Sequence, residues 1–112
     1  MPSTIDRPTF TALQDAAGAE FVAELVDTFL EEAPGMLAQL DSALASRDAE
    51  GFRRAAHSLK SNSYTFGATE LGARAKALEL GGLDSAADGA GLAGLKEEYA
   101  RAAAALKEMR GA

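Results

Sequence analysis

The chain has 112 residues, of which 47% are hydrophobic and 25% are charged, and this length and composition fit one globular domain. It contains no cysteine, which excludes disulfides, thiolate metal sites and cysteine nucleophiles. A formal net charge of -6 repels phosphate backbones, so we expect no nucleic acid partner. The apolar runs are far shorter than the ~20 residues of a membrane span, and residues 1–7 do not resemble an export signal. We therefore expect a cytoplasmic protein with no membrane segment.

The first part of the chain predicts a loose leader and two helices. We assign residues 1–8 to the leader, after which Thr9 caps a short helix that Gly18 ends. From about Ala19 to the mid-forties, apolar residues recur every three or four positions, and this phase continues through Pro34. One kinked helix is favoured, and a second helix that starts at the proline stays open as the alternative.

The next predicted helix is capped by Asp48, extends to about Phe66, and is followed by Gly67 as a stop. Advancing about 100° per residue gathers its apolar side chains into one stripe. We expect this stripe to be buried, and it consists of Phe52, Ala55, Ala56, Leu59, Ser63 and Phe66.

Two further helices are predicted, from about Thr69 to the glycine pair 81–82 and from about Ala90 to Met109. No segment alternates with period two, so no strand is expected. The pattern predicts an all-α fold, an antiparallel four-helix bundle with a short extra N-terminal helix. Residues 9–112 would form this single domain, which we expect to be a monomer.

The only histidine, His57, lies roughly 140° from the apolar stripe of its helix, so we expect its imidazole to face solvent. A solvent-facing imidazole is substantially neutral and nucleophilic near neutral pH. Arg53 at i−4 and Lys60 at i+3 lie on the same face, where two cations favour an anion. Most exposed histidines are ordinary surface residues, so the rest of the sequence decides what this one does.

Other catalytic arrangements are missing from the sequence. One histidine flanked by cations does not predict a metal site. Glu31–Glu32 and Glu97–Glu98 are adjacent pairs whose side chains point about 100° apart on a helix, and we interpret both as solvated surface. The glycine-rich stretch 81–94 lacks nucleotide-binding spacing, so ATP binding is not supported. His57 therefore needs a partner that supplies the rest of a reaction.

The run AHSLKSNSYTFGA at residues 56–68 resembles the signature of histidine-containing phosphotransfer (HPt) domains, AHxLKGxSxxxGA. The segment FLEEAP at residues 29–34 and Leu71 with ALE at residues 77–79 are similar to further parts of the family pattern. The likeness covers roughly residues 6–106. One position departs, since the family commonly has glycine where this chain has Ser61. Serine adds only a hydroxymethyl group, which docking should tolerate and which can donate to phosphoryl oxygens.

The resemblance implies a relay in which the neutral Nε2 of His57 takes a phosphoryl group from an aspartyl phosphate on a response-regulator receiver domain. The group then passes to the aspartate of another receiver. Lys60 would stabilise the phosphoryl oxygens. The receiver would bring the Mg²⁺ and the acidic pocket, and this chain would bind no metal or other cofactor. The implied partners are receiver domains and a sensor (hybrid) histidine kinase, and the chain is a phosphocarrier and not a kinase.

Several other residues are candidates around this site. The candidates for a docking surface, each of which could equally be ordinary surface, are Arg53, Arg54, Ser58, Ser61 and Tyr64. Structural roles are expected for Ser63, which would hydrogen-bond within the bundle, and for Gly67, which would let the chain turn. Apolar contacts to the receiver are a further hypothesis for Leu13, Leu30 and Leu37, and Arg74 is left out of the site.

Two alternatives stay open at this point. The chain could be a helical adaptor that binds a receiver or kinase domain without carrying phosphate, if Ser61 spoils the approach of the receiver. It could also be a dimerising bundle that phosphorylates itself with ATP, although the lack of a nucleotide-binding domain argues against this.

Overall fold

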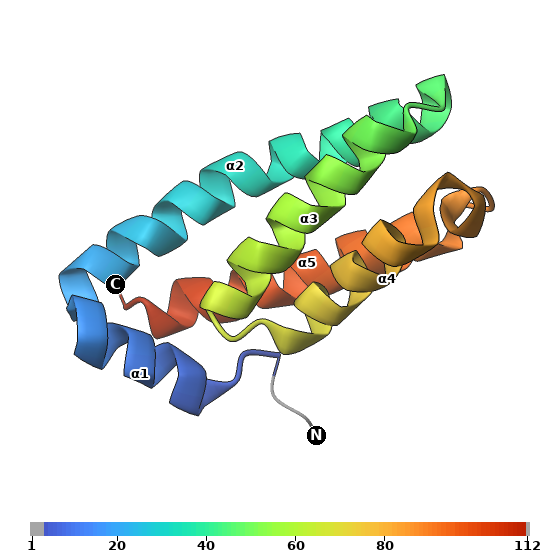
Figure 1. The fold of residues 1–112 in the computed structure, drawn as a ribbon. Coiled ribbons are helices and arrows are strands. Elements are labelled where there is room, and N and C mark those ends of the chain that lie inside the picture. Colours follow the sequence, from blue (N-terminus) through green and yellow to red (C-terminus); the bar gives the residue numbers. More distant parts are fainter. Residues whose placement is uncertain (1–3, 112) are drawn as a thin grey trace.

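The computed structural model describes residues 4–111, which form five helices and no strand (Figure 1). The all-α class predicted from the sequence is confirmed. The helices are α1 (Arg7–Ala17), α2 (Ala19–Ser46), α3 (Ala49–Thr65), α4 (Thr69–Ala86) and α5 (Ala90–Met109).

The four longer helices contact one another in chain order. α3 packs between α2 and α4, α4 packs against α5, and α5 also contacts α2. Short connections reverse the chain direction from each of these helices to the next, and α1 lies near the turn between α3 and α4 (Figure 1). The molecule is elongated along these helices, with extents of 41 × 28 × 20 Å.

The apolar stripe predicted for α3 is buried in the core, as expected. Its members are Phe52, Ala55, Ala56, Leu59, Ser63 and Phe66. The one polar member, Ser63, donates its hydroxyl proton to the carbonyl oxygen of Leu59 at 2.6 Å, so burial leaves the hydroxyl hydrogen-bonded. The opposite side of α3 is consequently the side that solvent reaches.

The start of α1 corrects two predictions. The helix begins at Arg7 and its N-cap is Asp6, whose carboxylate accepts from the backbone N–H of Thr9 at 3.2 Å and from the Thr9 hydroxyl. Ile5 is buried in the core. The predicted leader was therefore too long, since residues 5–8 belong to the fold, while residues 1–3 lie outside the described residues. Aspartate and threonine are both good caps, and Pro8 is tolerated in a first helical turn, so the sequence alone fits either start.

The turn from α3 to α4 is built around Gly67, which has a φ of +82°. The N–H of Gly67 donates to the carbonyl of Tyr64 at 3.1 Å, and the N–H of Ala68 donates to the carbonyl of Ser63 at 2.8 Å. These are the two bonds of a Schellman helix ending. A side chain at Gly67 would be strained by the backbone and would also lie 2.8 Å from the carbonyl oxygen of Asp6. The turn is therefore tight and ties α1 to the α3–α4 hairpin.

The other helix boundaries test the remaining predictions. α2 continues through Pro34 as one helix, and Asp48 caps α3 by accepting from the N–H of Gly51 at 3.0 Å. The break predicted at the glycine pair is present at Gly82, but helix resumes after it and ends at Ala86, which is buried. The predicted glycine-rich loop is thus shorter than expected. The predicted bounds of the last helix agree with α5.

Replacing Gly82 tests the break in α4. Its φ of 69° and ψ of -161° lie in a region that only glycine adopts readily, and no atom would contact an added Cβ. Gly82→Ala is expected to lower the free energy of unfolding by about 1 to 3 kcal/mol through backbone strain alone, measured by urea denaturation.

The control is Gly35→Ala in α2, where an added Cβ also meets nothing. Alanine favours a helix interior over glycine, so this variant should be more stable by about 0.5 to 1 kcal/mol. Equal effects of the two substitutions would contradict the assignment of strain to residue 82.

Candidate functional site

The candidate site lies midway along α3, on the side that faces away from the core. The His57 side chain is 54% exposed, which agrees with the prediction that its imidazole meets solvent. The neighbouring helix on this side is α4, which comes back antiparallel after the tight turn at Gly67 (Figure 1). The site is therefore a surface of the α3–α4 hairpin and not an enclosed pocket.

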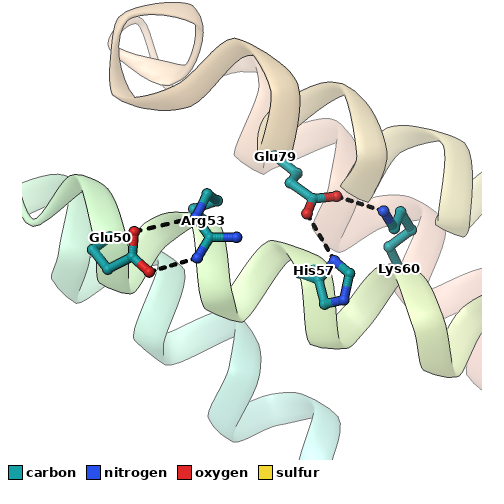
Figure 2. A network of polar contacts seen from close by, with 5 residues as sticks. All are labelled: Glu50, Arg53, His57, Lys60 and Glu79. Atoms are coloured by element: carbon teal, nitrogen blue, oxygen red, sulfur yellow. Dashed lines mark hydrogen bonds and ion pairs between the residues drawn. The ribbon is translucent and has the colours of Figure 1, made fainter.

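A carboxylate from α4 joins the two predicted site residues. Glu79 Oε2 lies 2.8 Å from His57 Nδ1, and Glu79 Oε1 accepts from Lys60 Nζ at 2.6 Å (Figure 2). The Glu79 side chain is only 12% exposed and that of Lys60 is 23% exposed. The expectation that only cations flank the histidine is thus wrong, because the Lys60 ammonium group reaches the site already paired with a carboxylate.

The charge of Glu79 fixes the tautomer of the histidine. The hydrogen bond from Lys60 lowers the pKa of the Glu79 carboxyl, desolvation opposes this, and the hydrogen bond to His57 lowers the pKa further. Glu79 is therefore ionised at neutral pH and can only accept hydrogen bonds. The shared proton must sit on Nδ1 of a neutral imidazole, which leaves the lone pair on Nε2. The second ring nitrogen points away from Glu79 in Figure 2, so this lone pair faces outward.

Glu79 is part of the ALE segment that resembles the family pattern, but no role was predicted for it from the sequence. The available signal was the hairpin itself, because antiparallel neighbours lie at similar distances on either side of the turn. His57 is ten residues before Gly67 and Glu79 is twelve residues after it. Helical periodicity alone describes one helix at a time, which is why it did not bring α4 into the site.

Arg53, the second cation predicted beside His57, is also paired. Its Nε donates to Glu50 Oε2 at 3.2 Å and its Nη2 donates to Glu50 Oε1 at 2.5 Å. The side chains are 50% and 61% exposed, so solvent surrounds this ion pair. The hydrogen bond to Glu50 raises the pKa of Arg53, and the charges of Glu50 and, more weakly, of Glu79 add to the effect, while desolvation opposes it.

The predicted docking residues are all exposed, and two of them lie toward α2 while another lies toward α4. Arg54 and Ser58 line an open groove between α2 and α3 with a volume of about 700 Å³, together with Glu31 and Glu32 of α2. Tyr64 faces α4, as His57 does, and its ring covers Gly72 so closely that a Cβ there would lie 2.9 Å from ring atoms.

The structure also places the remaining candidates. Leu13, Leu30 and Leu37 are partly buried and pack against the core. Arg74 pairs with Glu70 at 3.3 Å, and its guanidinium lies beside Gly94 of α5, away from His57.

Glu98 corrects a prediction, because it is buried and pairs with Arg101 at 2.8 Å instead of lying on a solvated surface. It sits between Leu95 and Ala102 on the buried face of α5, at helical spacing from both. Glu31 and Glu32, the other adjacent pair, are exposed as expected.

Within residues 4–111, no three histidine, aspartate or glutamate side chains converge as metal ligands would. None of the helices in the same range has the length and apolar character needed to cross a bilayer.

Comparison with known proteins places this geometry in a family. The family described as Hpt domain matches residues 24–105, which is most of the chain. The chain belongs to the Hpt domain family. The matched range contains the whole of this Hpt domain's polar site, from Glu50 through His57 to Glu79.

A solved structure agrees with this membership. The Hpt domain is similar to the crystal structure of histidine-containing phosphotransfer protein B (HptB) from Pseudomonas aeruginosa PAO1, with 29% sequence identity and a TM-score of 0.83. The match covers 98% of this chain and 96% of the other. A comparison with curated protein sequences gave no match.

The tautomer of His57 is directly testable. In long-range ¹H–¹⁵N spectra recorded where the ring is neutral, we expect the proton on Nδ1 in the wild type, because Glu79 accepts from it. Glu79→Ala should abolish this preference, whereas Glu70→Ala, which removes an exposed carboxylate elsewhere on α4, should preserve it. A wild-type ring protonated on Nε2 would contradict the assignment.

The lowered pKa of Glu79 predicts a pH dependence of stability. A carboxyl whose pKa is lower in the folded than in the unfolded state stabilises the fold above the unfolded value, here about 4.5, and this contribution disappears as pH falls through the folded value. Wild type should therefore be more stable than Glu79→Gln at neutral pH, with the gap closing below about pH 4.5. Thermal midpoints measured from pH 7 to pH 3 would check this.

The same pair of proteins in a Lys60→Gln background provides the control. Lys60 is the largest cause of the lowered pKa, so the pH-dependent part of the difference should become smaller there. A gap that is independent of pH in both backgrounds would contradict the coupling.

Proposed function

We propose that this Hpt domain is a histidine phosphotransfer protein that relays a phosphoryl group between aspartates of response-regulator receiver domains through phospho-His57. The observation that carries the proposal is the exposed imidazole whose Nδ1 is held by Glu79 while Nε2 stays open. An imidazole with a free ring nitrogen in solvent is a nucleophile that needs no separate base. What the site lacks for the reaction, the partner must supply.

The proposed step is a direct exchange of bonds at phosphorus. The Nε2 lone pair forms a bond to the phosphorus of the aspartyl phosphate, the bond from phosphorus to the aspartate oxygen breaks, and the aspartate leaves as a carboxylate. The ring gains a positive charge, which the Nδ1–H shares with the ionised Glu79. Glu79 is thus a positioning residue, since it orients the ring and compensates its charge without touching the phosphoryl group.

Lys60 is proposed to stabilise the phosphoryl oxygens. Its ammonium group has three donors, and the bond to Glu79 uses one of them. The bond also holds the side chain, which reduces the entropy lost when the phosphoryl group arrives. The Mg²⁺ and the acidic pocket are proposed to belong to the receiver, so that this chain is a phosphocarrier without an ATP site and not a kinase by itself.

The receiver is proposed to dock over the exposed side of α3. Ser58 follows His57 directly and borders the groove between α2 and α3, with Arg54 one turn earlier. Ser61, which replaces the glycine common in the family, is exposed and small, so it leaves the approach to the ring open. A sensor (hybrid) histidine kinase would carry the receiver that loads the domain.

We further propose that α2 to α5 form an antiparallel four-helix bundle, with α1 as the short extra helix, that this domain is monomeric, and that it acts in the cytoplasm. The closed order of contacts, in which α5 returns to α2, supports the bundle.

A transfer experiment tests the function. The protein is mixed with a phosphorylated receiver and Mg²⁺, and we expect an acid-labile, base-stable label in the wild type and none in His57→Gln. The reason is that His57 is the only histidine in the sequence. Circular dichroism of His57→Gln controls for folding, which should be unaffected because the side chain is exposed.

The outcomes separate the candidate functions. Label that persists in His57→Gln would refute the phosphocarrier, and binding of the receiver without transfer would favour an adaptor. Incubation with ATP alone should give no label, and labelling under this condition would indicate autophosphorylation.

A further inference from the structure

One ion pair near the imidazole has no part in the mechanism above. Glu50 and Arg53 lie on the first turns of α3, and two nitrogens of the guanidinium are bound to the two oxygens of the Glu50 carboxylate. The planar guanidinium binds the two oxygens of a carboxylate in this bidentate way, and it can bind the oxygens of a phosphoryl group in the same way. Glu50 therefore holds the Arg53 guanidinium, a cation that binds phosphate well, in a fixed position.

Arg53 lies one helical turn before the reacting histidine. It precedes His57 by four residues, a spacing that puts two side chains on one helix face with Cβ atoms about 5 to 6 Å apart. Figure 2 shows the guanidinium on this face, between Glu50 and the His57–Glu79 contact. The charge of Glu79, which bonds the imidazole, also contributes to the raised pKa of Arg53. The two polar clusters are therefore electrostatic neighbours.

We infer that Arg53 is a second phosphoryl-binding residue, and that it exchanges Glu50 for the phosphoryl group when His57 is phosphorylated. This inference rests on the proposed function. In the unphosphorylated domain Glu50 holds the guanidinium, and it competes with the phosphoryl group when that group arrives. Glu50 is thus a positioning residue.

The exposure of the two ion pairs decides which cation is released more easily. Lys60 is 23% exposed and its partner Glu79 is 12% exposed and bound by His57 as well, so this pair is shielded and doubly held. Glu50 and Arg53 are at least half exposed, and water screens such pairs so that they contribute little to stability. A phosphoryl group carries up to about two negative charges and three acceptor oxygens, so it offers an arginine more charge and more acceptors than one carboxylate does.

The test uses phosphoramidate, a small donor that phosphorylates imidazole without a docking partner. The Nε2–P bond forms, the P–N bond of phosphoramidate breaks, and ammonia leaves. We expect Glu50→Gln to be phosphorylated about two- to fivefold faster than wild type because Arg53 is free, and Arg53→Gln to be slower by a similar factor. The rate is followed by intact mass and by the ³¹P signal.

Glu70→Gln is the matched control. Glu70 occupies the second position of α4 as Glu50 does in α3, pairs with an arginine on its own helix, and has 57% side-chain exposure against 61% for Glu50. The substitution makes the same change in net charge and in the first helical turn, away from His57. Its rate should equal that of the wild type.

The double variant separates release of Arg53 from a general effect of charge. If Glu50 acts through Arg53, Glu50→Gln has no effect in the Arg53→Gln background. In addition, the Nε–H signal of Arg53, identified by its loss in Arg53→Gln, should move when wild type is phosphorylated, whereas that of Arg74 should stay.

Each result decides the inference. If wild type, Glu50→Gln and Glu70→Gln are all phosphorylated on His57 at equal rates, the exchange of Arg53 is overturned. The proposed function is not affected by this result. A rate increase for Glu50→Gln that persists in the Arg53→Gln background also overturns the exchange, because simple charge repulsion then explains the effect. No phosphorylation of wild-type His57 by either phosphoramidate or a phosphorylated receiver overturns the proposed function, and the exchange with it.

Discussion

The carboxylate of Glu79 is the interaction on which the site depends. One oxygen accepts from the lysine and the other from the ring, so a single side chain of α4 fixes the lysine, the ring orientation and the tautomer. Without it, Nδ1 and Nε2 would compete for the proton and the cation would be unpaired. The nucleophile is thus defined by a contact between two helices and not by the helix that carries it.

The fold around this contact serves to keep it in place. The Schellman ending at Gly67 makes the α3–α4 turn short, and the bond from the Asp6 N–H to the Gly67 carbonyl at 2.8 Å joins the first helix to that turn. The buried stripe of α3 sets the rotation of this helix, which leaves the histidine on the outside. Packing therefore decides the direction of the imidazole, and polar contacts decide its chemistry.

Much of the fold follows from periodicity within single helices. The stripe of α3, the exposure of His57 and the bounds of α5 could be predicted, because each depends on spacing along one segment. Glu79 could not be found in this way, because its role requires the register of two helices. Glu98 was available from the helical wheel, but the divergence of the adjacent pair 97–98 led to the prediction that both side chains are solvated. A buried glutamate is tolerated when an arginine pairs with it.

The contact between Tyr64 and Gly72 has a consequence for the phosphorelay site. Tyr64 is seven residues from His57 and Gly72 is seven residues from Glu79, so both contacts lie along one seam, two helical turns apart. Because Gly72 has no side chain, the tyrosine ring packs directly on the backbone of α4, and this contact sets the separation of the two helices. Bulk introduced at that distant point would open the seam and lengthen the reach from glutamate to imidazole. The absence of a side chain at Gly72 thereby supports the helix separation on which the contact between Glu79 and His57 depends.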